Sequence, residues 1–239
     1  MSARARVAVL ASGGGSNLQA LLDHHDALGD ARRADVVLVA SNRADAAALD
    51  RARVRGIPAA VLASAADGDA MLALLDAHRA DLVVLAGYLK LVPEAVTRRF
   101  DRRMLNVHPA LLPAFGGAGM YGARVHAAVI EAGARVSGAT VHFVDAEYDR
   151  GPILAQWPVP VVDGDTPASL AARVLRAEHL LLPRAVEALA AGRVALGDDR
   201  RVHGAFALPT DLPLGFTLDP TPTGVAAAMD IALGARAVV

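Results

Sequence analysis

The sequence predicts an α/β protein built on a doubly wound, mostly parallel β-sheet. Short apolar runs alternate with segments of helical periodicity, which is the rhythm of such a sheet. The runs at 36–40 and 81–85 are apolar almost throughout, as expected for parallel strands that helices cover on both faces. The segments 137–144 and 152–162 follow one another across a short turn, which favours an antiparallel edge.

Local signals mark the ends of the expected elements. A helix over 44–55 stops at Gly56, where the chain can turn freely. Thr166 is suited to cap a long helix, and Pro167 is suited to its first position. The other expected strands lie at 7–11, 35–40, 58–62 and 103–107, and the other expected helices begin at Leu18 or cover 69–78, 93–99, 124–132 and 167–191.

Composition excludes several classes of protein. With 239 residues, 54% of them hydrophobic, the chain can bury one core of ordinary size. The net charge of -1, without a run of Lys or Arg, argues against a nucleic-acid surface. The absence of cysteine excludes disulfides and thiolate metal sites. Neither a signal peptide nor a membrane-spanning apolar run is apparent, so we expect a soluble, cytoplasmic protein.

A glycine-rich turn at 13–15 separates the first expected strand from the first expected helix. Glycine lets backbone N–H groups approach an anion closely, and the start of a helix adds donors and a favourable dipole. The dinucleotide fingerprint does not fit, because its third glycine would fall on Leu18 and no acidic residue follows the second strand at 41–43. The turn is therefore either a site for a monophosphate or an ordinary tight turn.

Asn106 and His108 stand two residues apart at the end of an expected strand, so their side chains share one face. Pro109 stops the strand there. An amide can donate to a developing oxyanion, and histidine changes charge near neutral pH. The alternative is a capped strand with a satisfied histidine. The acidic loop 145–150, closed by Gly-Pro, is a third element that favours a catalytic site.

Two other segments have open interpretations. Residues 86–93 hold a glycine and several apolar side chains, which suit either a flat aromatic ligand or ordinary core packing. Residues 115–122 are rich in glycine and form either a lid or a disordered connector. From Arg193 onward we expect an extended arm, followed by a short helix near 226–233.

Four motifs occur in order and together carry a resemblance to a known family. They are the glycine turn with its continuation at 12–20, Leu-Ala-Gly-Tyr-Leu-Lys at 85–90, Asn-Val-His-Pro-Ala-Leu-Leu-Pro at 106–113, and His-Phe-Val at 142–144 followed by Asp-Arg-Gly-Pro at 149–152. Over about 7–194 the chain closely resembles the phosphoribosylglycinamide formyltransferases, which belong to the folate-dependent formyltransferases. The resemblance implies a Rossmann-like formyltransferase fold, with a catalytic domain at 1–194 and a C-terminal extension at 195–239.

The resemblance also implies site residues and ligands. The substrates would be phosphoribosylglycinamide, of purine biosynthesis, and 10-formyltetrahydrofolate as co-substrate, with no metal, nucleic acid or membrane partner, in a monomer or homodimer. The catalytic residues would be Asn106, His108 and Asp149. The ribotide would contact Gly14, Gly15, Ser16, Asn17, Gly87 and Glu178, and the folate would contact Leu89, Lys90, Leu91, Val92, Asn106 and Val144.

These residues suggest a mechanism through a tetrahedral intermediate. Asn106 and a protonated His108 would stabilise its oxyanion. Asp149 would hold His108 in the charged form, because a nearby anion raises a histidine pKa, and would assist proton transfer. His24, His25, His78 and His203 have no metal-ligand spacing and are expected at the surface.

Three departures from the family pattern stand out. The loop 63–69 is short and lacks arginine, Lys90 replaces a common arginine, and 115–122 is unusually rich in glycine. A hydrolase that releases formate would be expected to carry an added N-terminal domain, and a tRNA formyltransferase a further C-terminal one. A non-catalytic folate- or ribotide-binding protein would not need the set of Asn106, His108 and Asp149.

Overall fold

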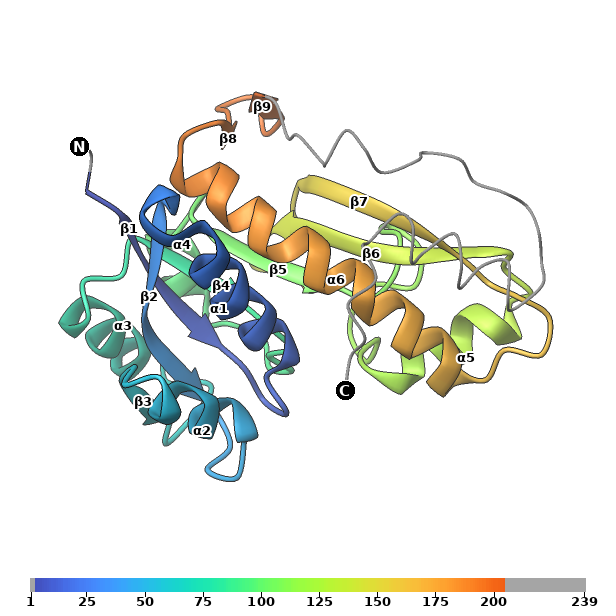
Figure 1. Cartoon of the computed structure of the whole chain (residues 1–239), viewed down its shortest axis with the longest axis horizontal. Helices are drawn as coiled ribbons and strands as arrows, with labels where there is room; N and C mark the ends of the chain where they lie inside the picture. The colour runs from blue at the N-terminus through green and yellow to red at the C-terminus, as the bar shows by residue number, and fades with distance from the viewer. Residues whose placement is uncertain (1–2, 205–239) are drawn as a thin grey trace.

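A seven-stranded β-sheet forms the centre of the molecule in the computed structural model, which describes residues 3–204 (Figure 1). The strand order is β3-β2-β1-β4-β5-β6-β7. The strands β1 to β5 pair in parallel, whereas the pairs β5–β6 and β6–β7 are antiparallel. The predicted doubly wound, mostly parallel sheet with an antiparallel edge is confirmed. The strands are β1 Ala5–Leu10, β2 Ala34–Ser41, β3 Ala59–Val61, β4 Leu82–Leu85, β5 Met104–His108, β6 Val136–Phe143 and β7 Ile153–Pro160.

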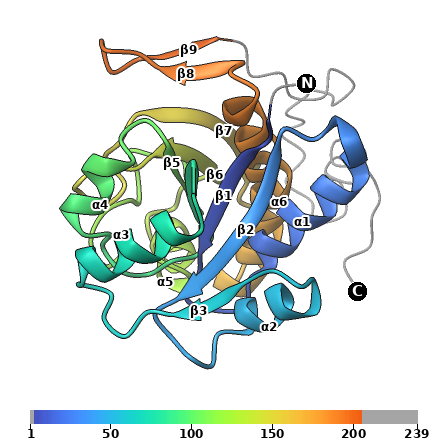
Figure 2. The same ribbon diagram turned by 90° about the vertical axis from the view of Figure 1, so that its left-hand side faces the viewer.

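Helices cover both faces of the sheet, giving three layers (Figure 2). On one face lie α3 and α4, and on the other lie α1, α2 and the long α6. The long helix starts as predicted, with Thr166 as its cap and Pro167 at its first turn. The helices are α1 Ser16–Leu28, α2 Ala47–Val54, α3 Gly68–Ala77, α4 Glu94–Arg99, α5 Ala123–Glu131 and α6 Pro167–Ala190, with a short 3-10 turn at Gly29–Ala31.

The core is divided by the sheet into two clusters. Alternate residues of β1 point to opposite faces, so Val7 and Val9 join one cluster while Ala8 and Leu10 join the other. All four side chains are fully buried. Burying an apolar side chain of Val or Leu size contributes roughly 1.5–3 kcal/mol, so both faces of this strand stabilise the sheet.

The loops after β1 and β4 lead in opposite directions, because β2 lies on one side of the β1–β4 pair and β5 lies on the other. Ser12 ties these loops together at the sheet edge. Its N–H donates to the carbonyl of Gly87 at 3.0 Å, and its Oγ accepts from the N–H of Leu89 at 2.9 Å. Such a point, at the carboxyl ends of parallel strands, is where open α/β sheets bind ligands.

The chain after α6 forms a β-hairpin where the sequence predicted an extended arm. The strands β8 Val194–Leu196 and β9 Val202–Gly204 pair antiparallel. Arg102 bonds Asp198 at 2.6 Å, and Asp101 accepts from Arg200 at 2.9 Å, so the hairpin is tied to the segment before β5. The helix expected at 226–233 lies outside the described residues.

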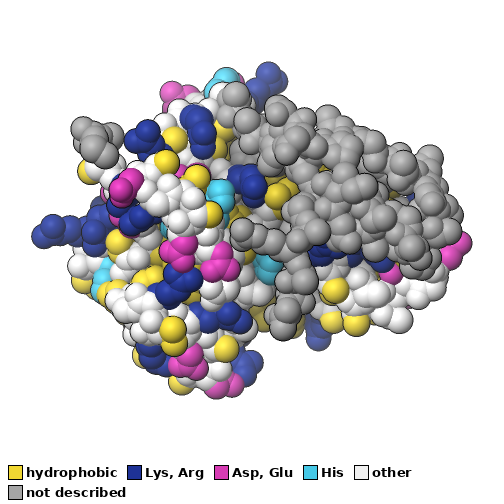
Figure 3. All heavy atoms as spheres, in the orientation of Figure 1, with side chains coloured by type: hydrophobic (Ala, Val, Ile, Leu, Met, Phe, Trp, Pro, Cys, Tyr) yellow, Lys and Arg dark blue, Asp and Glu magenta, His cyan; other side chains and the backbone are white. Residues whose placement is uncertain are grey.

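The described surface carries mixed charge. Basic and acidic side chains are interspersed over the part of the face that Figure 3 shows in colour. Within residues 3–204, no helix has both the length and the apolar character needed to cross a lipid bilayer.

Candidate active site

The end of β5 places Asn106 and His108 on one side of the sheet. The strand extends one residue further than predicted and ends at His108, just before Pro109. Strand β6 pairs with it so that His142 stands directly opposite Asn106. His108 is buried and Asn106 half-buried, so both are held in place by the sheet.

Asp149 completes the predicted group from the turn between β6 and β7. Its Oδ1 accepts from Asn106 Nδ2 at 3.3 Å, and its Oδ2 lies 3.4 Å from His108 Nδ1. Only 9% of its side chain is exposed. The backbone of Asp149 has a φ of +56°, which residues other than glycine rarely adopt, so the surrounding contacts must maintain it. The fold thus brings Asn106, His108 and Asp149 together.

The glycine-rich segment 115–122 lies against this group. The carbonyl of Phe115 is 2.8 Å from His108 Nε2, and the N–H of Gly117 donates to Asp149 Oδ2 at 2.9 Å. A Cβ on Gly116 would overlap the side chain of Leu112 and crowd Asp149 Cβ at 3.2 Å, so the segment packs closely against the site here. Of the two alternatives for this segment, these contacts fit a lid over the site.

The pKa of His108 depends on opposing effects. Burial lowers its pKa, and the opposing effects of Asp149 and of the Phe115 carbonyl do not compensate for it. Asp149 thus acts on the pKa of His108 in the expected direction, but burial acts against the charged form and has the larger effect. Burial raises the pKa of Asp149, but His142, His108 and the N–H of Gly117 outweigh that effect and leave it below its usual value.

His142 supports the group from the neighbouring strand. Its Nδ1 is 2.8 Å from the carbonyl of Phe143, which requires a proton on that nitrogen. Its Nε2 lies 3.5 Å from Asp149 Oδ1 and 3.0 Å from Asn106 Nδ2. This contact fixes the orientation of the Asn106 amide, with its nitrogen turned toward His142 and Asp149.

The predicted ribotide residues lie beside the start of α1. Asn17 Nδ2 donates to Glu178 Oε2 at 2.6 Å, which joins α1 to α6. Both side chains are buried, and Asn17 Oδ1 has no hydrogen-bond partner in the described part of the chain. Burial raises the pKa of Glu178 to about 7, against the opposing effect of Asn17. Such a pair suits a ligand with hydroxyl groups, because the carboxyl group and the free amide oxygen can both accept hydrogen bonds.

A cavity of about 690 Å³ joins the two groups, a size suited to small-molecule ligands. Gly14, Gly15 and Ser16 are not part of its wall and form the turn immediately before Asn17. Leu89 and Leu91 are 45% and 44% exposed, so they present apolar surface on the cavity wall. Its wall contains these predicted residues: Asn17, Gly87, Leu89, Lys90, Leu91, Val92, Asn106, His108, Val144, Asp149 and Glu178.

The cavity wall includes residues that the sequence analysis did not single out. His126 on α5 is buried, and its Nδ1 has no hydrogen-bond partner within residues 3–204. Burial lowers its pKa, and His108 adds to this effect, so the ring is neutral near pH 7. Because it stands among the buried residues Val125 and Val129, the sequence alone offers no signal that separates it from the core. The same is true of the first turns of α6, which also form part of the wall.

One expected surface histidine lies in the core. His25 is 6% exposed, and its Nε2 lies 3.2 Å from Glu187 Oε1. The same carboxylate accepts from the backbone N–H groups of Arg33 and Ala34. The prediction was wrong because His25 falls on the face of α1 that packs against α6. Within residues 3–204, no group of three or more ligating side chains is arranged for a metal ion.

The chain is similar to known proteins along most of its length. The family of formyl transferases matches residues 5–186. A phosphoribosylglycinamide formyltransferase, chloroplastic, of Arabidopsis thaliana is 47% identical over 204 residues, which is 82% of this chain and 69% of that protein. The trifunctional purine biosynthetic protein adenosine-3 of Homo sapiens is 40% identical over 83% of this chain but only 20% of its own length. The chain thus spans about two thirds of the plant relative and a fifth of the human one.

A solved structure of a related enzyme also matches the chain along most of its length. The crystal structure of glycinamide ribonucleotide transformylase 1 from Symbiobacterium toebii matches with a TM-score of 0.77 and 41% identity, covering 84% of this chain and 93% of that one. Identity at this level, together with a match along most of the fold, establishes common descent and a common architecture. This chain therefore belongs to the formyl transferase family.

Proposed function

We propose that this chain transfers the formyl group of 10-formyltetrahydrofolate to the amine of 5'-phosphoribosylglycinamide, a step of purine biosynthesis. The observation that carries the proposal is the convergence of Asn106, His108 and Asp149 in one cavity with the Asn17–Glu178 pair. The names of the relatives supply the substrate, and the site has groups suited to each part of it.

The ribotide would bind with its ribose in the cavity and its phosphate at the glycine turn beside the cavity. The turn 13–15 and the first N–H groups of α1, which have no partner within the helix, suit a phosphate. Asn17 and Glu178 would bind the ribose hydroxyls. Gly87 has open space around its Cα, so substrate can approach its backbone.

The folate half of the cavity is mostly apolar. Leu89, Leu91, Val92 and Val144 would pack against the faces of the ring system. The exposed Lys90 would supply a positive charge to the anionic end of the folate, without the bidentate geometry that arginine offers.

The amine nitrogen attacks the formyl carbon, forming a C–N bond and leaving an oxyanion on a tetrahedral intermediate. Asn106 Nδ2 donates to this oxyanion once it releases Asp149 Oδ1, and loss of such a donor typically costs about 3–4 kcal/mol of barrier. Neutral His108 and ionised Asp149 form an acceptor for the proton that leaves the amine, and His108 becomes charged at this step. His108 can then donate from Nε2 to the oxyanion, provided that the substrate oxygen replaces the carbonyl of Phe115.

The second half of the reaction breaks the bond between the formyl carbon and the folate nitrogen. The pair of Asp149 and His108 returns the proton to that leaving nitrogen, so the cycle is balanced without an external acid or base. Proton transfer by a positioned group contributes roughly 10²–10⁴-fold to a rate.

The experiment measures release of tetrahydrofolate from 10-formyltetrahydrofolate with and without the ribotide. Release that requires the ribotide, with formation of the formylated product, is the expected result. Release at the same rate without the ribotide would identify a hydrolase that produces formate. No release in either case would identify a binding protein and overturn the catalytic roles.

We also propose a cytoplasmic location and a monomeric or homodimeric state. Location is open to experiment in the source cell, since the Arabidopsis thaliana relative is named as chloroplastic. Light scattering of the purified chain distinguishes the two oligomeric states.

A further inference from the structure

Helix α2 is packed directly against the glycine turn that precedes α1. The N–H of Ala48 donates to the carbonyl of Gly13 at 3.1 Å. Arg51, one turn further along the same helix, donates from Nε to the carbonyl of Gly14 at 2.8 Å. A second nitrogen of its guanidinium group, NH1, donates to Gln19 Oε1 at 3.0 Å. One side chain therefore binds both the turn and the first turns of α1.

These contacts determine where the N–H groups of the turn point. In a planar trans peptide, the carbonyl and the N–H point in opposite directions. Because the carbonyls of Gly13 and Gly14 face α2, the N–H groups of Gly14 and Gly15 face away from it. The carbonyl of Gly15 accepts from the N–H of Gln19 and begins α1. Consecutive N–H groups that point outward ahead of a helix make an anion-binding nest.

Gly15 shows how closely the two parts fit. Its φ is +72°, and a Cβ at this position would lie 2.8 Å from Ala48 Cα and 3.3 Å from Arg51 Cδ. The backbone of Gly15 therefore packs directly against α2, with no room for a side chain between them. The bond from Arg51 to Gly14 holds the turn in this position.

We infer that Arg51 is a positioning residue for the phosphate of the substrate, acting through the Gly14–Gly15 peptide. The inference rests on the proposed function, in which this turn binds the ribotide phosphate. Arg51 holds the peptide with its N–H toward the anion. Its half-buried guanidinium also places a positive charge behind the nest without contacting the phosphate directly. A purely structural role for Arg51 would be to join α2 to α1, and the test must separate these two roles.

The test compares two acceptors, the phosphorylated ribotide and its phosphate-free riboside, in Arg51→Gln, Arg51→Lys and the wild-type chain. Arg51→Gln is expected to raise the KM for the ribotide by about 10- to 100-fold, the range for a charged hydrogen bond, while kcat changes less than about twofold. Kinetics with the riboside and the KM for the folate should be unchanged. Arg51→Lys keeps the charge but not the two-nitrogen geometry, so its KM for the ribotide should lie between those of the wild-type chain and Arg51→Gln.

Arg53→Gln is the matched control. Arg53 belongs to the same helix but is exposed and pairs with Asp50 on the surface, so its loss should leave all constants unchanged. Equal losses with ribotide and riboside in the Arg51 variants, or none with either, would overturn the inference. If Arg51→Gln does not fold, the comparison of the two acceptors in Arg51→Lys decides.

The outcome also separates this inference from the proposed function. If the wild-type chain transfers formyl to the ribotide and prefers it over the riboside, but the Arg51 variants keep that preference, only the role of Arg51 fails. If the wild-type chain does not form the formylated ribotide at all, the proposed function itself fails.

Discussion

Asp149 is the residue on which the catalytic group depends. Its two oxygens interact with Asn106 and His108 on β5 and with Gly117 of the segment above the site. These groups satisfy one another, so a bound substrate has to replace some of these contacts. The 3.3 Å contact of Asn106 with Asp149 is longer than the 2.8 Å contact of His108 with Phe115 and is therefore the easier one to exchange.

The first prediction concerns this group. We expect Asn106→Ala to lower kcat by about 10²–10³-fold, because an oxyanion donor is lost. His108→Ala and Asp149→Asn should lower it by roughly 10²–10⁴-fold, because proton transfer is lost. Steady-state kinetics gives kcat, and calorimetry gives the affinity for the ribotide, which should change little. Equal losses in turnover and in ribotide affinity would contradict the assigned roles.

A second prediction follows from Glu178, whose pKa is raised from 4.5 to about 7 by burial. Between these pH values the folded chain holds a proton that the unfolded chain releases, so this residue makes stability fall as pH rises. Above pH 7 the full cost applies, about 3 kcal/mol for a pKa change of this size. The ionised carboxylate of Glu178 therefore lowers the stability of the folded chain, as expected for a residue whose role is in binding.

The change Glu178→Gln removes the charge, while its amide oxygen can still accept from Asn17. Urea denaturation should show the variant to be more stable than the wild-type chain at pH 8, by up to about 3 kcal/mol, and nearly equal to it at pH 4.5. Affinity for the ribotide should fall at the same time. A stability difference that is the same at both pH values would show that the charge of Glu178 is not its origin.

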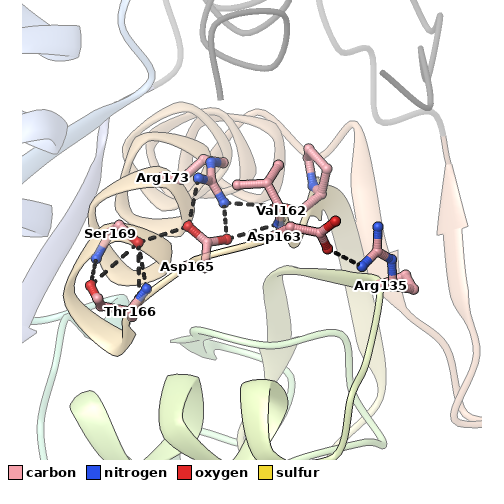
Figure 4. A network of polar contacts seen from close by, with 8 residues as sticks. Arg135, Val162, Asp163, Asp165, Thr166, Ser169 and Arg173 are labelled. Atoms are coloured by element: carbon pink, nitrogen blue, oxygen red, sulfur yellow. Dashed lines mark hydrogen bonds and ion pairs between the residues drawn. The ribbon is translucent and has the colours of Figure 1, made fainter. Parts of the chain in front are cut away.

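The start of α6 is set by a polar network that also shapes one wall of the cavity (Figure 4). Arg173 binds both oxygens of Asp165 at 2.8 and 2.9 Å, with side chains only 13% and 3% exposed. Asp165 also accepts from Ser169 and from the N–H of Val162. Burial raises the pKa of Asp165, but Arg173 and these donors outweigh that effect and lower it.

The third prediction uses two aspartates in this network. We expect Asp165→Ala to lower the free energy of unfolding by about 3–5 kcal/mol, because it leaves the buried charge of Arg173 without its partner. Asp163→Ala is the control. Asp163 pairs with Arg135 at the surface, with side chains 78% and 64% exposed, and its loss should cost no more than about 0.5 kcal/mol. Similar losses for both variants in denaturant unfolding would refute the distinction.

Most elements could be predicted because local signals agreed with the fold. Thr166 and Pro167 marked the start of α6, and the continuous apolar run in β4 marked a covered strand. The hairpin β8–β9 could not be predicted, because its strands are short and the pairs with Asp101 and Arg102 come from a distant part of the chain. The buried place of His25 likewise depends on α6, which the sequence of α1 does not reveal.

The whole sheet explains why one cavity can serve two substrates. The glycine turn follows β1, Gly87 follows β4, and His108 ends β5, so the parallel strands deliver all three to the same edge. The carboxyl ends of parallel strands meet at one edge of a sheet, which accounts for this convergence. The sequence did not predict that burial lowers the pKa of His108, because the burial of this ring appears only in three dimensions.

The last prediction concerns how much of the chain the site requires. All residues of the cavity wall lie between Asn17 and Glu178, and the family match ends at residue 186. A chain that ends after Gly204 retains the hairpin β8–β9 with its pairs to Asp101 and Arg102. We therefore expect it to keep kcat and both KM values within about twofold, as a compact domain with its own core should.

A chain that ends after Gly192 provides the contrast. It loses Val194 and Leu196, which are 2% and 4% exposed, and with them a few kcal/mol of apolar burial. Its melting temperature should fall clearly below that of the chain ending after Gly204, while its active site keeps the same residues. If the longer of the two chains instead loses more than about tenfold in kcat/KM at unchanged melting temperature, the residues beyond 204 take part in catalysis or binding, and the predicted division at 194/195 into catalytic domain and extension is wrong.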